Sequence, residues 1–97
     1  MGQFAIFVTI KLKSGNAAIF RPLILENASA SARKEQNCLQ FQVLTDELNP
    51  DIFYLYEVYK GIEDFEIHRA SSHYKKYDDA SKDLIIERSI QRCILEA

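Results

Sequence analysis

The sequence has few glycines, and their placement excludes the common phosphate-binding loops. The three are Gly2, Gly15 and Gly61, each far from the others. Such loops need several glycines close together, because backbone N–H groups must approach the phosphate. We therefore expect no bound nucleotide. No serine lies in the Gly-x-Ser-x-Gly turn that presents a hydrolase nucleophile.

Cysteine is equally scarce, with Cys38 and Cys93 alone in 97 residues. Two cysteines are too few for a disulfide scaffold. Both lie in apolar runs, where a reduced thiol behaves as a small hydrophobic group. Two free thiols are therefore favoured, although a bridge between them stays open.

The spacing of the two histidines argues against a metal site. The sequence contains neither Cys-x-x-Cys nor His-x-x-x-His, and His68 and His73 are five positions apart. On one continuous helix that spacing separates them by roughly 140°. A two-histidine metal site is not expected, unless a break at Ser71-Ser72 brings the rings together. We expect no metal, flavin or other cofactor.

The charges show no excess that would indicate a polyanionic or membrane partner. Twelve lysines and arginines face fourteen acidic residues, a formal net charge of -2, without a basic stripe. This balance argues against nucleic acid and anionic membranes. The apolar runs are too short to span a bilayer, and the N-terminal residues lack a basic segment and a cleavage site. A cytoplasmic location is expected.

The hydrophobic periodicity predicts four strands and two helical regions. Alternating apolar residues predict strands at 4–12 and 38–44, and apolar segments predict two further strands at 52–59 and 85–95, with a turn-rich segment at 45–51. Helical spacing predicts a helix at 17–34. A second helical region covers 61–70 and 73–82 and is interrupted at Ser71-Ser72, which can cap the second part. The buried face of the first helix is expected to carry Ile19, Phe20, Leu23, Ile24 and Asn27.

This order, β-α-β-β-α-β, predicts a ferredoxin-like α+β fold. A chain of this length forms one domain, residues 1–97, with a four-stranded antiparallel sheet and both helices on one face. The strand at 52–59 is apolar on both sides: Phe53, Leu55 and Tyr59 point one way, and Ile52, Tyr54, Tyr56 and Val58 the other. An uncovered apolar sheet face would expose more apolar surface area than monomers usually do. We therefore expect a homodimer with the two sheets facing each other.

Glu57 is the first candidate catalytic residue, because it is the only charge within the apolar run FYLYEVY. A buried carboxylate must be paired or hydrogen-bonded, or its pKa rises. It could act as a general base or hold a substrate hydroxyl. The alternatives are an ion pair with Arg88 or Arg92 and a place in the dimer contact.

His68 is the second catalytic candidate, because it follows Phe65 at helical spacing and should point toward the sheet. Imidazole moves protons near neutral pH, although a structural core histidine is an equal alternative. His73 and Tyr74 follow the serine pair and could line a pocket mouth. His73 could equally be a surface residue.

The remaining candidates would contact a substrate. Asn27 is a carboxamide on the apolar face of the first helix and could orient a carbonyl or phenol, or simply bond a loop. Most aromatic side chains must be core, but a few, among them Phe41 and Phe53, could form a flat slot for an aromatic ring.

The segments CLQFQVLTD and FYLYEVYKGIEDFEIHRASSHYKKY resemble the antibiotic-biosynthesis-monooxygenase family of dimeric α+β barrels. The resemblance covers nearly the whole chain. It rests on a Leu-x-Phe strand, a Tyr-Glu-x-Tyr strand and a helix with His-x-x-Ser-x-His. It implies a cofactor-independent monooxygenase, an oxidoreductase that uses O2 on a small aromatic or quinol-like substrate. It places Asn27, Glu57, His68 and His73 around the pocket.

Two alternatives stay open. The same segments are similar to an isomerase of a phosphorylated autoinducer-2-type sugar derivative. In that enzyme a histidine follows the asparagine of the first helix, whereas Ala28 follows Asn27 here. An isomerase also needs a phosphate clamp, and the basic residues considered for it form no cluster in the sequence: Lys11, Lys13, Arg33, Lys34, Lys75 and Lys76. The other alternative is a non-enzymatic, ligand-binding or structural dimer.

Overall fold

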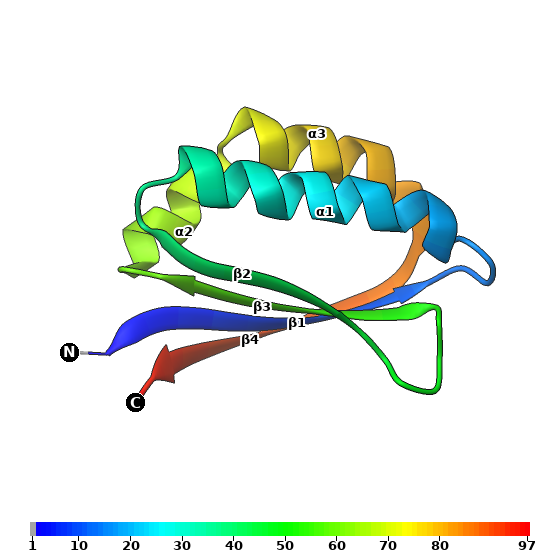
Figure 1. The fold of residues 1–97 in the computed structure, drawn as a ribbon, viewed down its shortest axis with the longest axis horizontal. Helices are drawn as coiled ribbons and strands as arrows, with labels where there is room; N and C mark the ends of the chain where they lie inside the picture. The colour runs from blue at the N-terminus through cyan, green and yellow to red at the C-terminus, as the bar shows by residue number, and fades with distance from the viewer. Residues whose placement is uncertain (1) are drawn as a thin grey trace.

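One antiparallel sheet carries all the helices on a single face (Figure 1). The computed structural model describes residues 2–97. The elements in chain order are β1 (Gln3–Leu12), α1 (Ala17–Lys34), β2 (Cys38–Thr45), β3 (Ile52–Tyr59), α2 (Ile62–Arg69), α3 (Ser72–Ser81), a 3-10 turn (Lys82–Leu84) and β4 (Ile85–Leu95). The strand order is β2-β3-β1-β4, and every neighbouring pair is antiparallel. The predicted ferredoxin-like fold is confirmed.

Turn and capping residues mark where the helices and strands begin and end. Gly15 adopts a positive φ of 81°, which favours glycine, in the turn between β1 and α1. The second helical region divides where the serine pair predicted. Ser71 is the N-cap of α3, and its hydroxyl accepts a hydrogen bond from the Tyr74 backbone N–H. No helix within residues 2–97 is long and apolar enough to cross a membrane.

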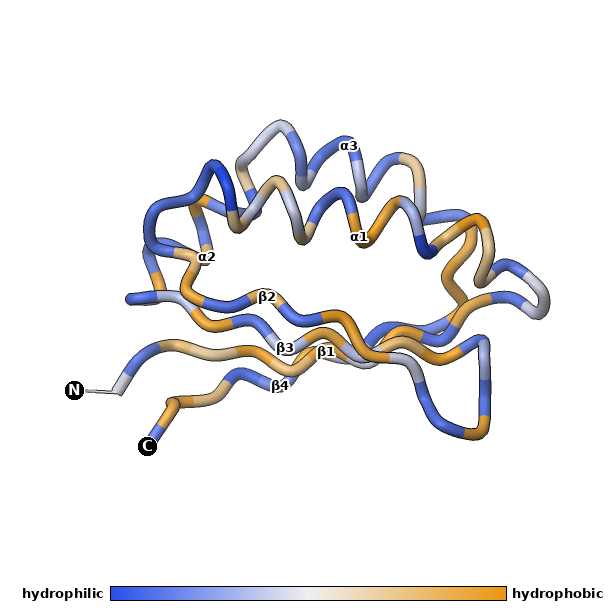
Figure 2. Tube along the Cα trace, viewed as in Figure 1, coloured by the Kyte–Doolittle hydropathy of each residue, from blue (hydrophilic) through white to orange (hydrophobic). Residues whose placement is uncertain are grey.

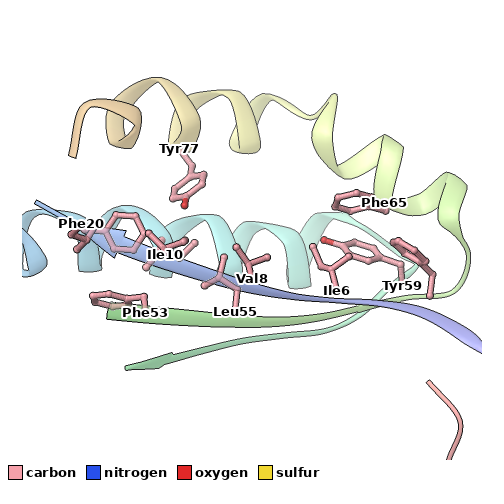
Figure 3. Close-up of a cluster of buried hydrophobic side chains, with 12 residues drawn as sticks. Ile6, Val8, Ile10, Phe20, Phe53, Leu55, Tyr59, Phe65 and Tyr77 are labelled. Atoms are coloured by element: carbon pink, nitrogen blue, oxygen red, sulfur yellow. The ribbon is translucent and has the colours of Figure 1, made fainter. Parts of the chain in front are cut away.

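The core lies between the sheet and the helices. Alternate residues of β1 and β3 point to this side, and Figure 3 shows Ile6, Val8 and Ile10 beneath the helices. Phe20 of α1 is fully buried, with its ring centroid 4.9 Å from that of Phe53 and 6.0 Å from that of Tyr77. One aromatic side chain therefore joins α1, β3 and α3.

The buried face of α1 differs in part from the prediction. Phe20, Ile24 and Asn27 are buried as expected, but Ile19 is 56% exposed. The buried stripe continues through Ala30 and Ser31. The helix follows the i, i+4, i+7 spacing closely, so that a residue one position before Phe20 is rotated out of the stripe. Figure 2 shows that hydrophobic residues concentrate in the strands and the first half of α1, whereas α3 is mostly hydrophilic.

The other face of the sheet has no covering layer (Figure 1). At its centre Phe7 lies beside Tyr56 in the register, and the Phe7 and Tyr54 rings stack with centroids 5.7 Å apart. Phe7 is 36% exposed, and Leu44 is also exposed. Polar residues of the neighbouring strands, such as Gln91 opposite Phe7, flank these aromatic rings. We call the three aromatic residues Phe7, Tyr54 and Tyr56, together with the adjoining aliphatic Leu44, the aromatic band.

Candidate functional site

A cavity of about 180 Å³ lies between the sheet and α2 and α3. Its floor is aliphatic and comes mainly from β1, β3 and β4. Its polar walls come from α1, β3, α2 and α3, and three arginines surround it. The lining residues are Ile6, Val8, Ile10, Asn27, Leu55, Glu57, Phe65, His68, Arg69, Tyr74, Tyr77, Arg88, Ile90 and Arg92. The two predicted catalytic residues, Glu57 and His68, therefore border one cavity, which we call the main cavity.

Glu57 is held in this wall by β3. Its side chain is 4% exposed, and the Tyr59 hydroxyl donates a hydrogen bond of 2.6 Å to its Oε1. Burial raises the pKa of Glu57 above its ordinary value, and the Tyr59 hydrogen bond and the nearby His68 offset only part of that rise. The buried carboxylate is therefore a stronger base than a solvated one.

The alternative ion pair between Glu57 and Arg88 or Arg92 is not formed. Arg88 lies 3.9 Å from Asp78, and the guanidinium of Arg92 lies over the ring of Phe4, 5.1 Å from its centroid. In place of an arginine, the basic group beside Glu57 is the His68 imidazole, whose Nε2 is 3.9 Å from Oε1 of Glu57.

His68 lies in the last turn of α2 and is 2% exposed, on the same buried face as Phe65, as predicted. Its Nδ1 is 2.8 Å from Oε2 of Glu35 and 3.3 Å from the Ser31 hydroxyl. Its two ring nitrogens thus face two carboxylates, Glu35 and Glu57. Aromatic rings enclose the imidazole, and the ring centroid of Tyr74 is 5.2 Å away.

Glu35 was not anticipated from the sequence. It follows α1 as the C-cap residue, and its side chain is only 8% exposed. Burial acts to raise the pKa of Glu35, but the hydrogen bonds and charges of His68 and His73 outweigh it, so the pKa lies below the ordinary value. Its Oε2 contacts both His68 Nδ1 and His73 Nε2.

The break between α2 and α3 brings the two histidines together. Their ring centroids are 5.8 Å apart, because the chain leaves the helical path after Arg69 and begins a new helix at Ser72. The 140° separation expected on a continuous helix therefore does not apply. His73 is 10% exposed in its side chain and lines a second cavity of about 340 Å³ between α1 and α3.

The side chains of Glu35, His68 and His73 together are of a kind that could hold a metal ion. One ligand atom each from Glu35, His68 and His73 lies within 4.8 Å of the others. Oε1 of Glu35 is buried and has no hydrogen-bond partner among the residues that the structure describes. We call these three residues the Glu35 cluster.

Among the predicted substrate contacts, Asn27 and Tyr74 do line the main cavity. Asn27 also lines the second cavity, and its buried Oδ1 has no hydrogen-bond partner in the described part of the chain, residues 2–97. Phe53 lies outside the lining of the main cavity and is fully buried in the core against Phe20. Phe41 does not line the main cavity either, because its ring packs against the imidazole of His68, 5.7 Å between centroids.

The arginines around the main cavity were missed as site residues. Arg88 and Arg92 lie on β4 opposite Ile10 and Ile6, and Arg69 ends α2. Arg88 and Arg92 are four positions apart on a strand, so alternation alone places both on the cavity side. That alternation was the signal available in the sequence.

Comparison with known proteins identifies one family. The family model described as antibiotic biosynthesis monooxygenase matches residues 3–80. No curated protein matches the sequence.

Solved structures with the same fold come from several bacteria. PA3566 from Pseudomonas aeruginosa is 21% identical, with a TM-score of 0.92 over 100% of this chain and 97% of its own. A protein from Nitrosomonas europaea, provisionally named antibiotic biosynthesis monooxygenase, is 26% identical, with a TM-score of 0.86 and 97% of both chains covered. A Caulobacter crescentus protein of the same provisional name is 18% identical, with a TM-score of 0.93, covering 99% of this chain and 92% of its own.

Proposed function

The chain belongs to the antibiotic biosynthesis monooxygenase family, and on that premise we propose that it oxidises a small electron-rich aromatic compound, such as a quinol or phenol, with O2 in the main cavity. Glu57 is the base in this proposal, and His68 is its partner. No flavin or metal contacts the substrate. The supporting observation is that Glu57 and His68 border one cavity with an aliphatic floor.

The chemistry requires little from the protein. An aromatic hydroxyl becomes a much better electron donor when it loses its proton, and the resulting anion can pass an electron to O2. A ring carbon then exchanges its hydrogen for one oxygen atom, and the other oxygen leaves as water. A phenol thereby becomes a quinone and a quinol becomes a hydroxyquinone, a four-electron oxidation in which the substrate supplies all the electrons. The protein needs a base, a dry cavity and groups that favour the anion.

The contacts of Glu57 support its proposed role as the base. The Tyr59 hydrogen bond and the approach of His68 both involve Oε1. Oε2 is therefore the oxygen that would accept the proton of a substrate hydroxyl. The aliphatic floor would hold the aromatic ring, and the low dielectric constant of buried surroundings strengthens each electrostatic contact.

The three arginines support the anionic form of the substrate. Arg92 lies over the rings of Phe4 and Phe65, with its carbon Cζ 5.1 Å and 5.8 Å from their centroids. Arg88 has only the distant contact with Asp78, at 3.9 Å between partly exposed side chains. Positive charge near an apolar cavity lowers the free energy of a substrate anion relative to its neutral form.

Oxygen consumption by the purified chain tests the proposal. We expect chelator-treated protein to accelerate O2 uptake with a panel of small quinols and phenols, well above the rate of a His68→Ala control. Mass spectrometry of the product after 18O2 incubation should show one labelled oxygen. Uptake that equals that of the control for every compound would contradict the proposal.

The arginines also give weight to a second candidate, the isomerase of a phosphorylated autoinducer-2-type sugar. The sequence showed no clustered phosphate clamp, but Arg69, Arg88 and Arg92 gather at the main cavity. Guanidinium groups bind phosphate well. Turnover of such a sugar phosphate without O2, followed by NMR, would favour the isomerase, whereas turnover that requires O2 favours the oxygenase.

We also propose that two copies associate through the uncovered sheet face, around the aromatic band. We expect wild-type chain to have twice the 11.2 kDa mass of one chain in light scattering. Phe7→Lys should produce monomers, because a buried lysine charge opposes association. Ile67→Lys is the matched control, since Ile67 is 61% exposed on α2.

Thiol alkylation gives an independent measurement of the dimer. Cys93 pairs with Ala5 in the register and lies on the uncovered face, so the dimer should protect it and Phe7→Lys should expose it. Burial raises the pKa of the Cys38 thiol to about 12, so Cys38 reacts slowly in both forms. Equal mass and equal Cys93 reactivity in wild type and Phe7→Lys would contradict the interface.

A further inference from the structure

We propose that the Glu35 cluster is a binding site for a divalent transition-metal ion such as zinc. Glu35 follows α1, His68 lies in the last turn of α2 and His73 lies in the first turn of α3, so three separate segments each supply one donor. Their side chains are 8%, 2% and 10% exposed. The proposal goes beyond the oxygenase function, because the ion would lie on the far side of the His68 ring from the main cavity.

The donor set matches the chemistry of these ions. Imidazole nitrogen and carboxylate oxygen are common ligands of zinc and iron, and two histidines with one carboxylate form a recurrent set that leaves positions open. Bonds of about 2.0–2.2 Å place tetrahedral ligands roughly 3.3 Å apart. The Nδ1 of His68 and the Oε2 of Glu35 are 2.8 Å apart, and all three donors lie within 4.8 Å of one another. The Glu35 Oε2 and the His68 Nδ1 would have to separate by roughly half an ångström to admit an ion.

An independent observation comes from the second oxygen of Glu35. Oε1 is buried and has no hydrogen-bond partner within residues 2–97. Leaving a buried carboxylate oxygen unpaired is unfavourable, because the oxygen has lost its hydrogen bonds to water. A bound ion would satisfy this oxygen through bidentate coordination or through a metal-bound water, so the cluster has a structural reason to take a ligand.

The surroundings of His68 have the form of an outer metal shell. A metal-bound histidine usually directs its other ring nitrogen to a carboxylate, which fixes the ring and its tautomer. Nε2 of His68 faces Oε1 of Glu57 at 3.9 Å while Nδ1 faces the cluster. An ion on Nδ1 would keep the ring proton on Nε2, directed at Glu57. The metal would thus fix the orientation of His68 in the wall of the main cavity without contacting the substrate.

The second cavity offers the route to the site. It has a volume of about 340 Å³ and reaches His73 between α1 and α3. Lys34, Lys76 and Glu26 also line it, so its charges give a divalent cation little long-range electrostatic attraction. The affinity must come from the three donors themselves.

Zinc titration of the full chain, made without a histidine tag and stripped with chelator, tests the proposal. Calorimetry should show one ion per chain with micromolar or tighter affinity. His73→Ala and Glu35→Gln should each weaken binding by more than about a hundredfold, the upper range for outer-shell groups alone. Glu66→Gln, an exposed glutamate of α2 paired with Arg69 at 3.9 Å, is the matched control and should bind as wild type does.

Imidazole NMR identifies the ligand atoms directly, because His68 and His73 are the only two histidines in the sequence. Zinc should shift the resonances of Nδ1 of His68 and Nε2 of His73 in folded protein. Circular dichroism verifies that each variant folds. No binding, or equal binding by His73→Ala, would overturn the proposal and show a hydrogen-bonded cluster only. Because neither measurement uses substrate or O2, that failure would leave the oxygenase proposal untouched.

Discussion

Replacing Glu57 with glutamine is expected to lower kcat for O2 uptake by about 10²- to 10⁴-fold, the usual contribution of general acid–base catalysis. Glutamine has nearly the same shape, and its carbonyl can still accept the hydrogen bond that Tyr59 donates at 2.6 Å. What it lacks is the ability to take the substrate proton. The side chain is 4% exposed, so solvent does not provide a substitute base.

The folded state should tolerate this change, and that distinguishes a catalytic from a structural role. A buried carboxylate is unfavourable by desolvation, and the raised pKa of Glu57 reports this. We therefore expect an unchanged or higher Tm for Glu57→Gln. The comparison variant is Glu66→Gln, with its side chain 60% exposed on α2. A Glu57→Gln enzyme within threefold of wild type would show that Glu57 is not the base.

The largest expected effect on stability comes from Phe20→Ala. Removing a fully buried phenylalanine ring leaves a cavity and destabilises a protein by about 3–5 kcal/mol. Phe20 is fully buried and contacts Phe53 and Tyr77, so its loss affects three elements at once. A domain of this size is stable by only about 5–15 kcal/mol in total.

Urea unfolding at one fixed protein concentration measures this effect, since association would contribute to apparent stability. Leu25→Ala is the control on the same helix, and its side chain is 48% exposed. It should reduce the free energy of unfolding by less than about 1 kcal/mol. A similar loss in both variants would mean that the core does not depend on Phe20 as the packing indicates.

The fold was predictable because each element carries its own local signal. The apolar run of β3 and the helical spacing of α1 predicted Ile52–Tyr59 and Ala17–Lys34 with the same bounds as the structure. Glu57 was recognised because it is the only charge within that run. Ile19 was misplaced because two neighbouring apolar residues, Ile19 and Phe20, cannot both lie at the centre of a helical stripe.

The site was only partly predictable, because it depends on packing between distant segments. Glu35 follows a helix and precedes Gln36, so locally it looks like a solvated end. It is buried only because His68 and His73, 33 and 38 positions later, close over it. No local pattern contains that information. The serine pair did signal the helix break, but not the direction in which the chain would turn.

The number of residues in the junction between α2 and α3 therefore sets whether the His73 imidazole points toward Glu35. Removing or adding one residue within 69–72 would rotate His73 by about 100° about the axis of α3 and carry it away from Glu35. A sequence with an insertion between its two histidines would have lost the shared carboxylate even if every residue type were present.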